Sequence, residues 1–424
     1  MRWFAPAVLV GAVALGGAAA QSARTGPRIE REVPWATSGV WLKAETHVHT
    51  RFSDGAATVD EIVAHAVANG CDVLAITDHT DPKLKAATPE YHAAIAAARE
   101  RTPRLALITG LEWNVPPGGG ADHAVVLLPP EMDNAAATGE FKTRFDDETR
   151  HEGSAESAVA AFQWLRNEGS AASVMPVVFL DHPSRKAPDV AAVRTKVLWL
   201  SDIGAGLFAG VEGAPGHQHA TPLGAYDGSL RPEDRWDPAI APPGAAWDQL
   251  LSAGSAISGA LAASDFHSER NGDYWPCEFS ATWIYAPDRT VPGVLRALHA
   301  GSFFGVHGGI ARRVQLLVSA EGVPRPAVPG ERLRVPAGQK VSIELRAEVP
   351  STDWQGQANH VDFVELLGAS PAGTTVLRSG ALDNGVFRHE LIVPSGGIAI
   401  RARGRRVVDD GPDLLFYTNA VQVR

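Results

Sequence analysis

The stretch Thr46-His47-Val48-His49-Thr50-Arg51-Phe52-Ser53-Asp54 decides how the first part of this chain is interpreted. It follows a short strand-like run at residues 41–44. Side chains of an extended strand alternate between its two faces, so His47 and His49 point to the same side. Two imidazoles on one side of a strand, with Asp54 just beyond them, indicate a metal site. Because a lone His-x-His pattern is common by chance, this interpretation needs further candidate ligands later in the chain.

Strand-like and helix-like runs alternate from residue 41 to about residue 306. Apolar periodicity predicts helices at residues 59–68, 91–101, 154–167, 247–251 and 291–300. Short apolar runs predict strands at residues 72–77, 105–109, 124–128, 174–180, 208–212, 257–263 and 282–285. This alternation predicts a parallel sheet or barrel. In such barrels, the loops at the C-terminal ends of the strands carry the chemistry.

Candidate metal ligands stand at or just beyond the ends of these predicted strands. They are His47, His49, Asp54, His79, Glu112, His123, His182, Asp265 and His267. A catalytic zinc usually takes three protein ligands, so this larger set suits two or three divalent ions that share carboxylates. Mixed imidazole and carboxylate ligands favour zinc, manganese or iron over calcium or magnesium. Ligand type alone does not identify the metal.

At about residue 313 the predicted secondary structure changes from alternating strands and helices to strands alone. Short alternating strands are predicted at residues 314–318, 340–346, 361–367, 375–378, 386–393, 398–403 and 420–423. Turns rich in Gly, Pro, Ser or Asn separate them, and no helix is predicted between them. This pattern predicts a β-sandwich of immunoglobulin-like type.

The first residues have the pattern of an export signal. Arg2 precedes an apolar run at residues 3–15, and small residues follow as far as Ala20. An uncleaved anchor is the alternative, although the run is short for a spanning helix, which needs about 20 apolar residues. We therefore expect an exported protein, periplasmic or secreted, with no stable membrane insertion after cleavage. The predicted organisation is a signal peptide at 1–20, a leader at 21–40, a barrel at 41–312 and a sandwich at 313–424.

Charge and cysteine content limit the possible partners. The formal net charge of -10 argues against a sequence-independent nucleic-acid binder, which would need a basic face. The chain has two cysteines, Cys71 and Cys277. They argue against a disulfide framework but are compatible with a single disulfide bond. A small-molecule substrate is the partner we expect, and the sequence does not predict the oligomeric state.

The ordered motifs resemble those of the polymerase-and-histidinol-phosphatase (PHP) superfamily of metal-dependent hydrolases. The motifs are His47-Val48-His49, Thr77-Asp78-His79, Gly110-Leu111-Glu112, His182 and Ser264-Asp265-Phe266-His267, all within residues 41–308. Each motif is weakly specific alone, and the ordered set is much more specific. The resemblance implies an α/β fold, a distorted (β/α)7 TIM-like barrel, with a cluster of up to three metal ions.

The resemblance also implies a division of the ligands among the ions. His47, His49, Glu112 and Asp265 would hold the first ion. Glu112 would bridge to a second ion held with His123 and His182, while Asp54, His79 and His267 would hold a third. Some members of the superfamily have His where this chain has Asp54, which makes the third site the point of departure from the family pattern.

The predicted chemistry is hydrolysis. A water or hydroxide shared by two cations is a nucleophile at neutral pH, because the cations lower its pKa. Asp78 and Asp181 each directly precede a ligand histidine, so they are candidate catalytic acids or partners of the ligands. Ordinary capping or turn roles are the alternative for both. His267 is a candidate catalytic residue as well as a ligand.

Four residues are candidates for substrate contact. Arg185, three residues past His182, could hold a substrate anion, and a solvated surface arginine is the alternative. Trp113, next to Glu112, is the aromatic residue most expected to face the substrate. His217 and His219 follow Gly-Ala-Pro-Gly on a loop that would overhang the site.

Three functions remain in view. The resemblance favours a phosphoester substrate, a phosphomonoester or a small phosphodiester, although few basic residues besides Arg185, Arg51 and Arg270 could cradle a phosphate. The exported two-domain layout is also similar to carbaryl-hydrolase-like members, which cleave an aryl carbamate. A carboxylester or carbamate hydrolase is therefore the alternative enzyme. A cell-surface or carbohydrate-binding protein with an inert barrel is the third, and the complete ligand set counts against it.

Overall fold

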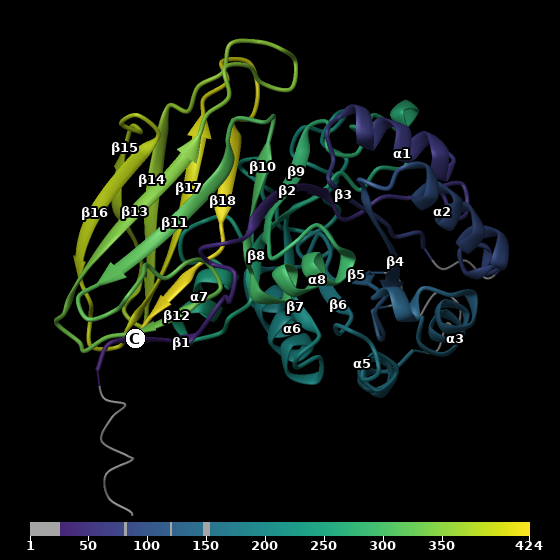
Figure 1. Ribbon diagram of the computed structural model, residues 1–424, viewed down its shortest axis with the longest axis horizontal. Coiled ribbons are helices and arrows are strands. Elements are labelled where there is room, and N and C mark those ends of the chain that lie inside the picture. The colour runs from purple at the N-terminus through teal and green to yellow at the C-terminus, as the bar shows by residue number, and fades with distance from the viewer. Residues whose placement is uncertain (1–25, 80–82, 119–120, 147–152) are drawn as a thin grey trace, which may run out of the picture.

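The computed structural model describes residues 26–79, 83–118, 121–146 and 153–424 of the chain. The predicted signal peptide at residues 1–20 lies outside the described residues. A curled sheet with its helices forms one half of the molecule, and a β domain lies beside it (Figure 1). None of the helices that the structure describes is both long and apolar enough to cross a membrane.

Seven adjacent strands build the curled sheet. In spatial order they are β2 (Val40–Glu45), β3 (Val73–Ile76), β4 (Ala106–Asn114), β5 (His123–Leu127), β6 (Val177–Leu180), β7 (Phe208–Ala214) and β8 (Ser258–Ala262). Neighbours are parallel except at β5, which is antiparallel to both β4 and β6. The expected parallel sheet therefore has one reversed strand. Because of this reversal, the first residue of β5, His123, lies at the end of the sheet where the other strands finish.

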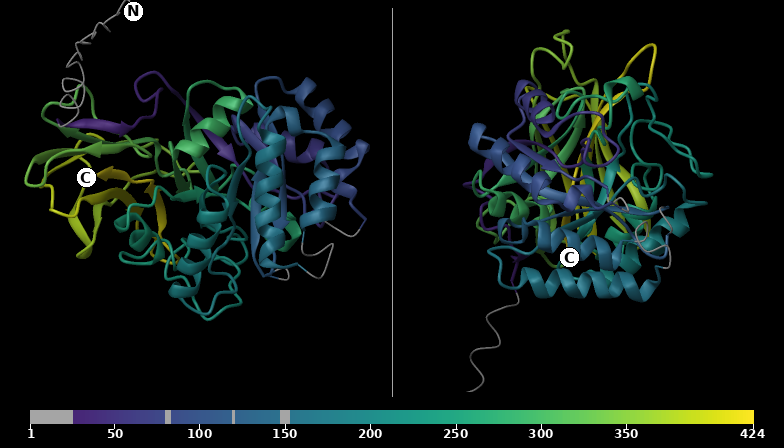
Figure 2. Two further views of the ribbon diagram at one scale, coloured as in Figure 1. Left: turned by 90° about the horizontal axis from the view of Figure 1, so that it is seen from below. Right: turned by 90° about the vertical axis from the view of Figure 1, so that its right-hand side faces the viewer.

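Helices flank this sheet. They are α1 (Val59–Ala68), α2 (Pro89–Arg101), α3 (Ala135–Phe145), α5 (Ala155–Gly169), α6 (Val190–Ile203), α7 (Ala246–Ser252) and α8 (Val291–Ala300), with short 3-10 turns η2 (Lys85–Ala87), η3 (Pro130–Met132) and η4 (Glu269–Asn271). Thr58 and Glu61 form a capping box that starts α1, and the Ser154 hydroxyl caps α5. The blue helices α2, α3 and α5 lie on the side away from the C-terminal strands (Figure 2). The sequence did not predict α3 or α6.

The last strand of the curled sheet, β8, lies against two strands that extend the other edge of the sheet. Strands β9 (Ser280–Ala286) and β10 (Phe303–His307) extend the sheet beyond β2. The Thr282 hydroxyl of β9 donates to the Ala262 carbonyl of β8 and accepts from its N–H, both at 2.9 Å. At Gly305 of β10, an added Cβ would lie 2.3 Å from the Ala260 carbonyl oxygen, so only glycine permits this close approach.

The C-terminal half consists of strands. They are β11 (Arg312–Ala320), β12 (Arg332–Arg334), β13 (Lys340–Glu348), β14 (Phe363–Ser370), β15 (Gly373–Gly380), β16 (Val386–Ile392), β17 (Ile398–Arg406), β18 (Leu414–Thr418) and β19 (Val421–Val423). Strands β11, β13 and β16 form a separate three-stranded sheet. The others join the curled sheet because β18 pairs with β10, so one 16-stranded sheet runs through both halves.

Part of the predicted leader at 21–40 forms a strand. This strand, β1 (Arg28–Arg31), pairs with β12 of the C-terminal half. The N-terminal end of the described chain is thus fastened to the β domain before the chain enters the barrel.

The sequence was compatible with a single disulfide bond, and the structure contains that bond. Cys71, between α1 and β3, is bonded to Cys277, which precedes β9. The bond joins residues 206 positions apart and leaves no free cysteine. It fastens the segment between β8 and β9, which carries Asp265 and His267, to the outer part of the barrel.

Candidate metal centre

The strand ends bring the predicted ligands together at one end of the curled sheet. β2 leads to His47 and His49, β3 to His79, β4 contains Glu112, β5 begins with His123, β6 leads to His182, and β8 leads to Asp265 and His267. Val48 and Phe266 form a parallel bridge at this end, so the His47–His49 and Asp265–His267 segments lie side by side. Among the described residues, these strand ends carry every group that the sequence predicted to bind a metal except Asp54, which lies on the loop after His49.

The first group of side chains has the geometry of a four-coordinate metal site. The Nε2 atoms of His47 and His49 lie 3.1 Å apart. Glu112 Oε2 lies 3.3 and 3.1 Å from these two nitrogens, and Asp265 Oδ1 lies 3.3 Å from each. A regular tetrahedron with such edges has its centre about 2 Å from each corner, which matches the distances of zinc to nitrogen and oxygen ligands. The four atoms therefore fit one divalent ion.

The second group surrounds the other oxygen of the same carboxylate. Glu112 Oε1 lies 2.6 Å from His123 Nδ1 and 3.5 Å from His182 Nε2. Glu112 is 1% exposed, and both of its oxygens face imidazoles. A carboxylate placed in this way can bridge two ions, as the family resemblance implies.

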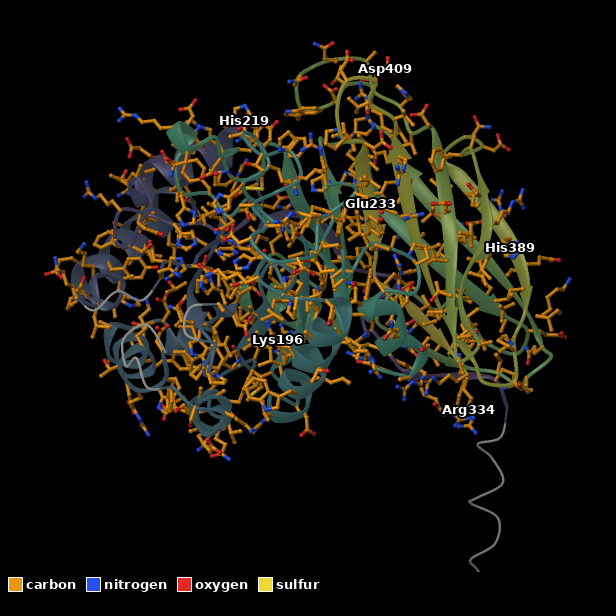
Figure 3. All side chains as sticks on the ribbon, turned by 180° about the vertical axis from the view of Figure 1, so that it is seen from behind. Lys196, His219, Glu233, Arg334, His389 and Asp409 are labelled. Carbon is orange, nitrogen blue, oxygen red and sulfur yellow. A yellow bond between two sulfur atoms is a disulfide. The ribbon has the colours of Figure 1, made fainter. Side chains whose placement is uncertain are left out.

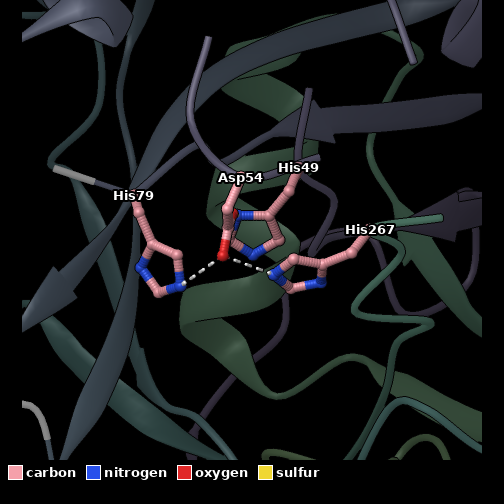
Figure 4. A group of neighbouring side chains, drawn as sticks. All are labelled: His49, Asp54, His79 and His267. Carbon is pink, nitrogen blue, oxygen red and sulfur yellow. Dashed lines mark ion pairs between the residues drawn. The ribbon is translucent and has the colours of Figure 1, made fainter. Parts of the chain in front are cut away.

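The third group lies at the open side of the site (Figure 4). Asp54 Oδ2 is 3.2 Å from His267 Nε2 and 3.9 Å from His79 Nε2, and Asp54 Oδ1 is 3.4 Å from His49 Nδ1. The Asp54 side chain is 55% exposed, unlike the buried carboxylates of Glu112 and Asp265. His79 Nε2 also lies 3.1 Å from Glu112 Oε2, so His79 connects the third group to the other two.

Several buried polar atoms in these groups make no hydrogen bond within the described chain. They are Glu112 Oε2, His182 Nε2, Asp265 Oδ1 and His79 Nδ1. A buried polar group without a partner is costly, so such atoms are normally satisfied by a ligand, an ion or water. Three of the four are atoms that point into the cluster. The residues present therefore fit divalent metal ions.

The electrostatics hold several ligands in the protonation state that metals require. Burial alone would raise the pKa of Glu112, but the surrounding imidazoles, His79 first, outweigh it and hold that pKa well below its usual range. His47 and other imidazoles do the same to the pKa of Asp265. Burial lowers the pKa of His79 to about 3 and that of His182 to about 4. These carboxylates are therefore ionised and these imidazoles neutral at neutral pH.

His49 provides a test by pH. Burial alone would lower its pKa, but hydrogen bonds with Asp265 and Glu112 outweigh burial and raise the pKa to about 9. Below that pH the imidazole of the metal-free protein keeps a proton, which an ion must displace. We expect the affinity for a divalent ion to rise with pH by up to about tenfold per pH unit for each proton displaced. Chelator-competition titrations at about pH 6 and about pH 8 measure this, and equal affinities would contradict it.

The sequence interpretation missed three carboxylates that support the ligands. Glu212 Oε1 lies 2.9 Å from His47 Nδ1, which orients the ring and leaves Nε2 to face the cluster. Glu45, whose pKa burial raises to about 7, accepts hydrogen bonds from the N–H groups of His47 and Ser264. Asp273 supports the segment after β8. Glu212 could have been found, because it closes a predicted strand as the ligands do. Glu45 could have been found in the same way, because it directly follows the strand-like run before His47, whereas Asp273 carries no such signal.

The two predicted aspartate acids occupy different positions. The Asp78 carboxylate accepts hydrogen bonds from the Thr50 N–H, the Thr50 hydroxyl and the Ser53 hydroxyl. It fastens the loop after His49, as the turn alternative describes, and its catalytic role stays a prediction. Asp181 is buried in a group with His47 and Glu212. Burial and then Glu212 raise the pKa of Asp181 well above its usual range.

The predicted aromatic contact with the substrate is wrong. Trp113 is fully buried, its Nε1 donates to the Phe145 carbonyl, and its ring packs against Phe141 and Phe162. Successive side chains of β4 point to opposite faces. Because Glu112 points into the cluster, its neighbour Trp113 has to point outward, into the core under α3 and α5.

The two histidines of the His217-Gln218-His219 motif lie in different environments. His217 Nε2 lies 2.9 Å from Asp265 Oδ2, so this residue joins the cluster. Burial alone would lower the pKa of His217, but Asp265 and Asp273 outweigh it and raise the pKa to about 10. His219 is exposed at the surface, where its ring stacks on Tyr274 (Figure 3). The structure does not bring His219 to the cluster.

His267 and Arg185 both lie at the site. The His267 ring faces Asp54 through Nε2, and its Nδ1 lies 3.0 Å from the Asp265 carbonyl oxygen. Arg185 is partly buried and lies close enough to His123 and His182 for its positive charge to oppose the protonation of both imidazoles. The solvated surface alternative for Arg185 therefore does not describe its position.

Comparisons with known proteins support a family assignment for part of the chain. Residues 45–155 match the family model described as PHP domain. No curated protein sequence matches the chain.

Three solved structures resemble the chain. One, from Bacteroides vulgatus, is a two-domain protein containing a predicted PHP-like metal-dependent phosphoesterase. Its sequence is 15% identical to this chain, the match covers 93% of this chain and 98% of that chain, and the TM-score is 0.43. A candidate metal-dependent phosphoesterase from Bifidobacterium adolescentis is 17% identical over 55% and 90% of the two chains, with a TM-score of 0.33. An amidohydrolase from Chromobacterium violaceum is 18% identical over 54% and 89%, with a TM-score of 0.31.

None of these three is described as a carbaryl hydrolase, so that resemblance stays a prediction. The matched residues 45–155 carry the ligands from His47 to His123, and the fold brings His182, Asp265 and His267 to the same cluster. Residues 45–155 thus match the PHP domain model, and the side chains that the fold brings together form candidate metal-ion sites.

Proposed function

We propose that this protein hydrolyses a phosphoester, either a phosphomonoester or a small phosphodiester. The observation that carries the proposal is the position of Arg185. Its positive charge opposes the protonation of His123 and His182, and it forms no salt bridge with any residue that the structure describes. Its Nε is buried without a hydrogen-bond partner among those residues. A guanidinium held in this way suits an anionic oxygen of a substrate.

The loop that carries Arg185 is held firmly. Asp237 accepts hydrogen bonds from the N–H and the hydroxyl of Ser184 and from the Tyr226 hydroxyl. The Arg185 carbonyl accepts from the N–H groups of Asp227 and Gly228. A cation on a fixed loop loses little conformational freedom when it binds an anion. The firm hold on this loop supports a role of Arg185 in orienting a phosphoryl group.

Divalent ions in this cluster would supply a nucleophile at neutral pH and stabilise the charge that develops in the transition state. The chain's own residues do the rest. Glu212 keeps His47 Nε2 directed at the cluster, and Asp78 fastens the loop that carries Asp54. Arg185 would bind a nonbridging oxygen and limit the orientations open to the substrate.

Turnover on two chromogenic esters tests the proposal. We expect metal-reconstituted protein to hydrolyse p-nitrophenyl phosphate, and Arg185→Ala to lower kcat/KM on it about 10- to 100-fold, because a hydrogen bond to a charged group contributes about 1.5–3 kcal/mol. Arg185→Lys should keep part of the activity. The control is Arg289→Ala, whose exposed side chain pairs with Asp72 on the outside of the barrel.

The second ester, 1-naphthyl N-methylcarbamate, distinguishes the alternative enzyme. Naphthol release without phosphate release would overturn the phosphoester assignment and favour carbamate hydrolysis, and Arg185→Ala would then have little effect. Elemental analysis of the same sample gives the identity and number of the metals. Bound metals with neither activity would contradict both assignments.

We also propose that the protein is exported. The N-terminal charged and apolar pattern supports this, as does the Cys71–Cys277 disulfide, because such bonds form and persist mainly in oxidising compartments. N-terminal sequencing of protein recovered from outside the cytoplasm should find cleavage near Ala20. Recovery of uncleaved protein in the cytoplasm alone would contradict export.

A further inference from the structure

His217 is held at both ends by carboxylates. Its Nδ1 lies 2.9 Å from Asp273 Oδ1, and its Nε2 lies 2.9 Å from Asp265 Oδ2. The ring cannot rotate without losing one of these contacts. Of the Asp265 oxygens, Oδ2 is therefore occupied by His217, while Oδ1 faces the Nε2 atoms of His47 and His49.

Asp273 fixes the whole arrangement. Besides His217, its carboxylate accepts hydrogen bonds from the N–H groups of His267 and Ser268, at 2.8 and 2.9 Å. Asp273 is 2% exposed, so these contacts are shielded from water. One carboxylate thus connects the loop after β7, which carries His217, to the segment after β8, which carries Asp265 and His267.

The close approach of the two segments depends on Gly216. A Cβ at this position would lie 2.2 Å from Asp265 Cβ and 2.4 Å from the Ser264 carbonyl oxygen, so any other residue would push the segments apart. The next residue, His217, has φ +60°, and Asp265 has φ +48°. Such φ values are uncommon for residues other than glycine and persist where the surroundings enforce them.

We propose that Asp273 and His217 are positioning residues that make Asp265 present one oxygen, Oδ1, to the ion of the first group. The inference rests on the metal-dependent part of the proposed function and not on the phosphoester assignment. Without His217, the Asp265 carboxylate could turn, and both of its oxygens would compete for the ion. Partners of metal ligands act in this way on ligand orientation, and their loss typically weakens metal binding 10- to 100-fold.

A direct ligand role for His217 is the rival interpretation, because His217, His267 and Asp273 also form a compact group. The two roles differ in what they do to metal stoichiometry. Loss of a ligand removes an ion even at saturating metal, whereas loss of a positioning residue weakens binding and leaves the number of sites unchanged.

The experiment is a chelator-competition titration of the full chain with Zn²⁺ and with Mn²⁺, together with elemental analysis at saturation. We expect His217→Ala and Asp273→Ala to lower the affinity for the affected ion about 10- to 100-fold, with the number of bound ions per chain unchanged. His217→Gln should recover part of the affinity, because its amide can still donate to a carboxylate. The control is His219→Ala, two residues along the same loop and outside the cluster (Figure 3).

The outcomes separate clearly. Unchanged affinity in His217→Ala, or the loss of one ion at saturation, would overturn the positioning role. If Asp273→Ala fails to fold, the comparison of His217→Ala, His217→Gln and His219→Ala still decides the question. Because the readout is metal binding, the inference can hold when no phosphoester is hydrolysed, and it can fail when one is.

Discussion

Glu112→Gln is expected to lower turnover by about three orders of magnitude, equivalent to about 4 kcal/mol of transition-state stabilisation, and to reduce the metal content. Glu112 is the side chain that all three ligand groups share. Its Oε2 faces His47, His49 and His79, and its Oε1 faces His123 and His182. The amide keeps the size of the side chain but removes its charge and replaces one acceptor oxygen with a donor. One half of a bridge between two ions is therefore lost.

The measurements are kcat/KM on the active ester and metal per chain on the same preparation. Glu269→Gln is the matched control, because Glu269 is exposed on η4 near the site and touches none of the ligands. A Glu112→Gln enzyme with at least a tenth of the wild-type activity and full metal content would refute the shared role.

The ligand cluster is the part that the sequence predicts best, for a physical reason. A residue at a strand end is placed by the strand alone, so an order of strands with ligands at their ends is enough to assemble a site. His47, Glu112 and His182 all follow this rule. Glu212 follows it as well and could have been recognised. Asp273 lies on a loop, and only the fold reveals that it reaches His217.

The mistaken substrate residue shows how the same rule can be misapplied. Trp113 is adjacent to Glu112, and adjacency in sequence suggested adjacency at the site. Alternation along β4 requires the opposite, as the burial of Trp113 shows. The correct inference from Glu112 pointing inward would have been that Leu111 and Trp113 point outward.

The join between the two halves was not predictable from local patterns. Strand β18, Leu414–Thr418, is buried along its whole length and so shows no alternation of apolar and polar residues. It pairs with β10, and the next residue, Asn419, fills the seam of the barrel. The Asn419 side-chain oxygen accepts from the N–H groups of Gly259 and Ala260, and its amide donates to the Gly301 and Phe303 carbonyls. Such a contact depends on tertiary structure alone.

The sequence predicted a barrel and a β-sandwich, and the structure shows how the two halves are connected. Arg401 of β17 reaches into the barrel half, where its Nε and Nη2 lie 2.7 and 3.0 Å from the two oxygens of Asp248 on α7. Arg401 is 1% exposed and Asp248 0%. The guanidinium also stacks over the Trp247 ring at 4.7 Å. The pair is thus a buried, bidentate contact between the two halves.

Arg401→Met is expected to lower the free energy of unfolding by about 3–5 kcal/mol, because it leaves the Asp248 carboxylate buried without its counter-charge. Denaturant titration measures the loss. The double variant Arg401→Met/Asp248→Asn should recover much of it, since the unpaired charge is then gone. Arg334→Met, at an exposed arginine of the β domain (Figure 3), is the control and should change stability by less than about 1 kcal/mol. Equal stabilities of Arg401→Met and Arg334→Met would show that the buried pair does not hold the two halves together.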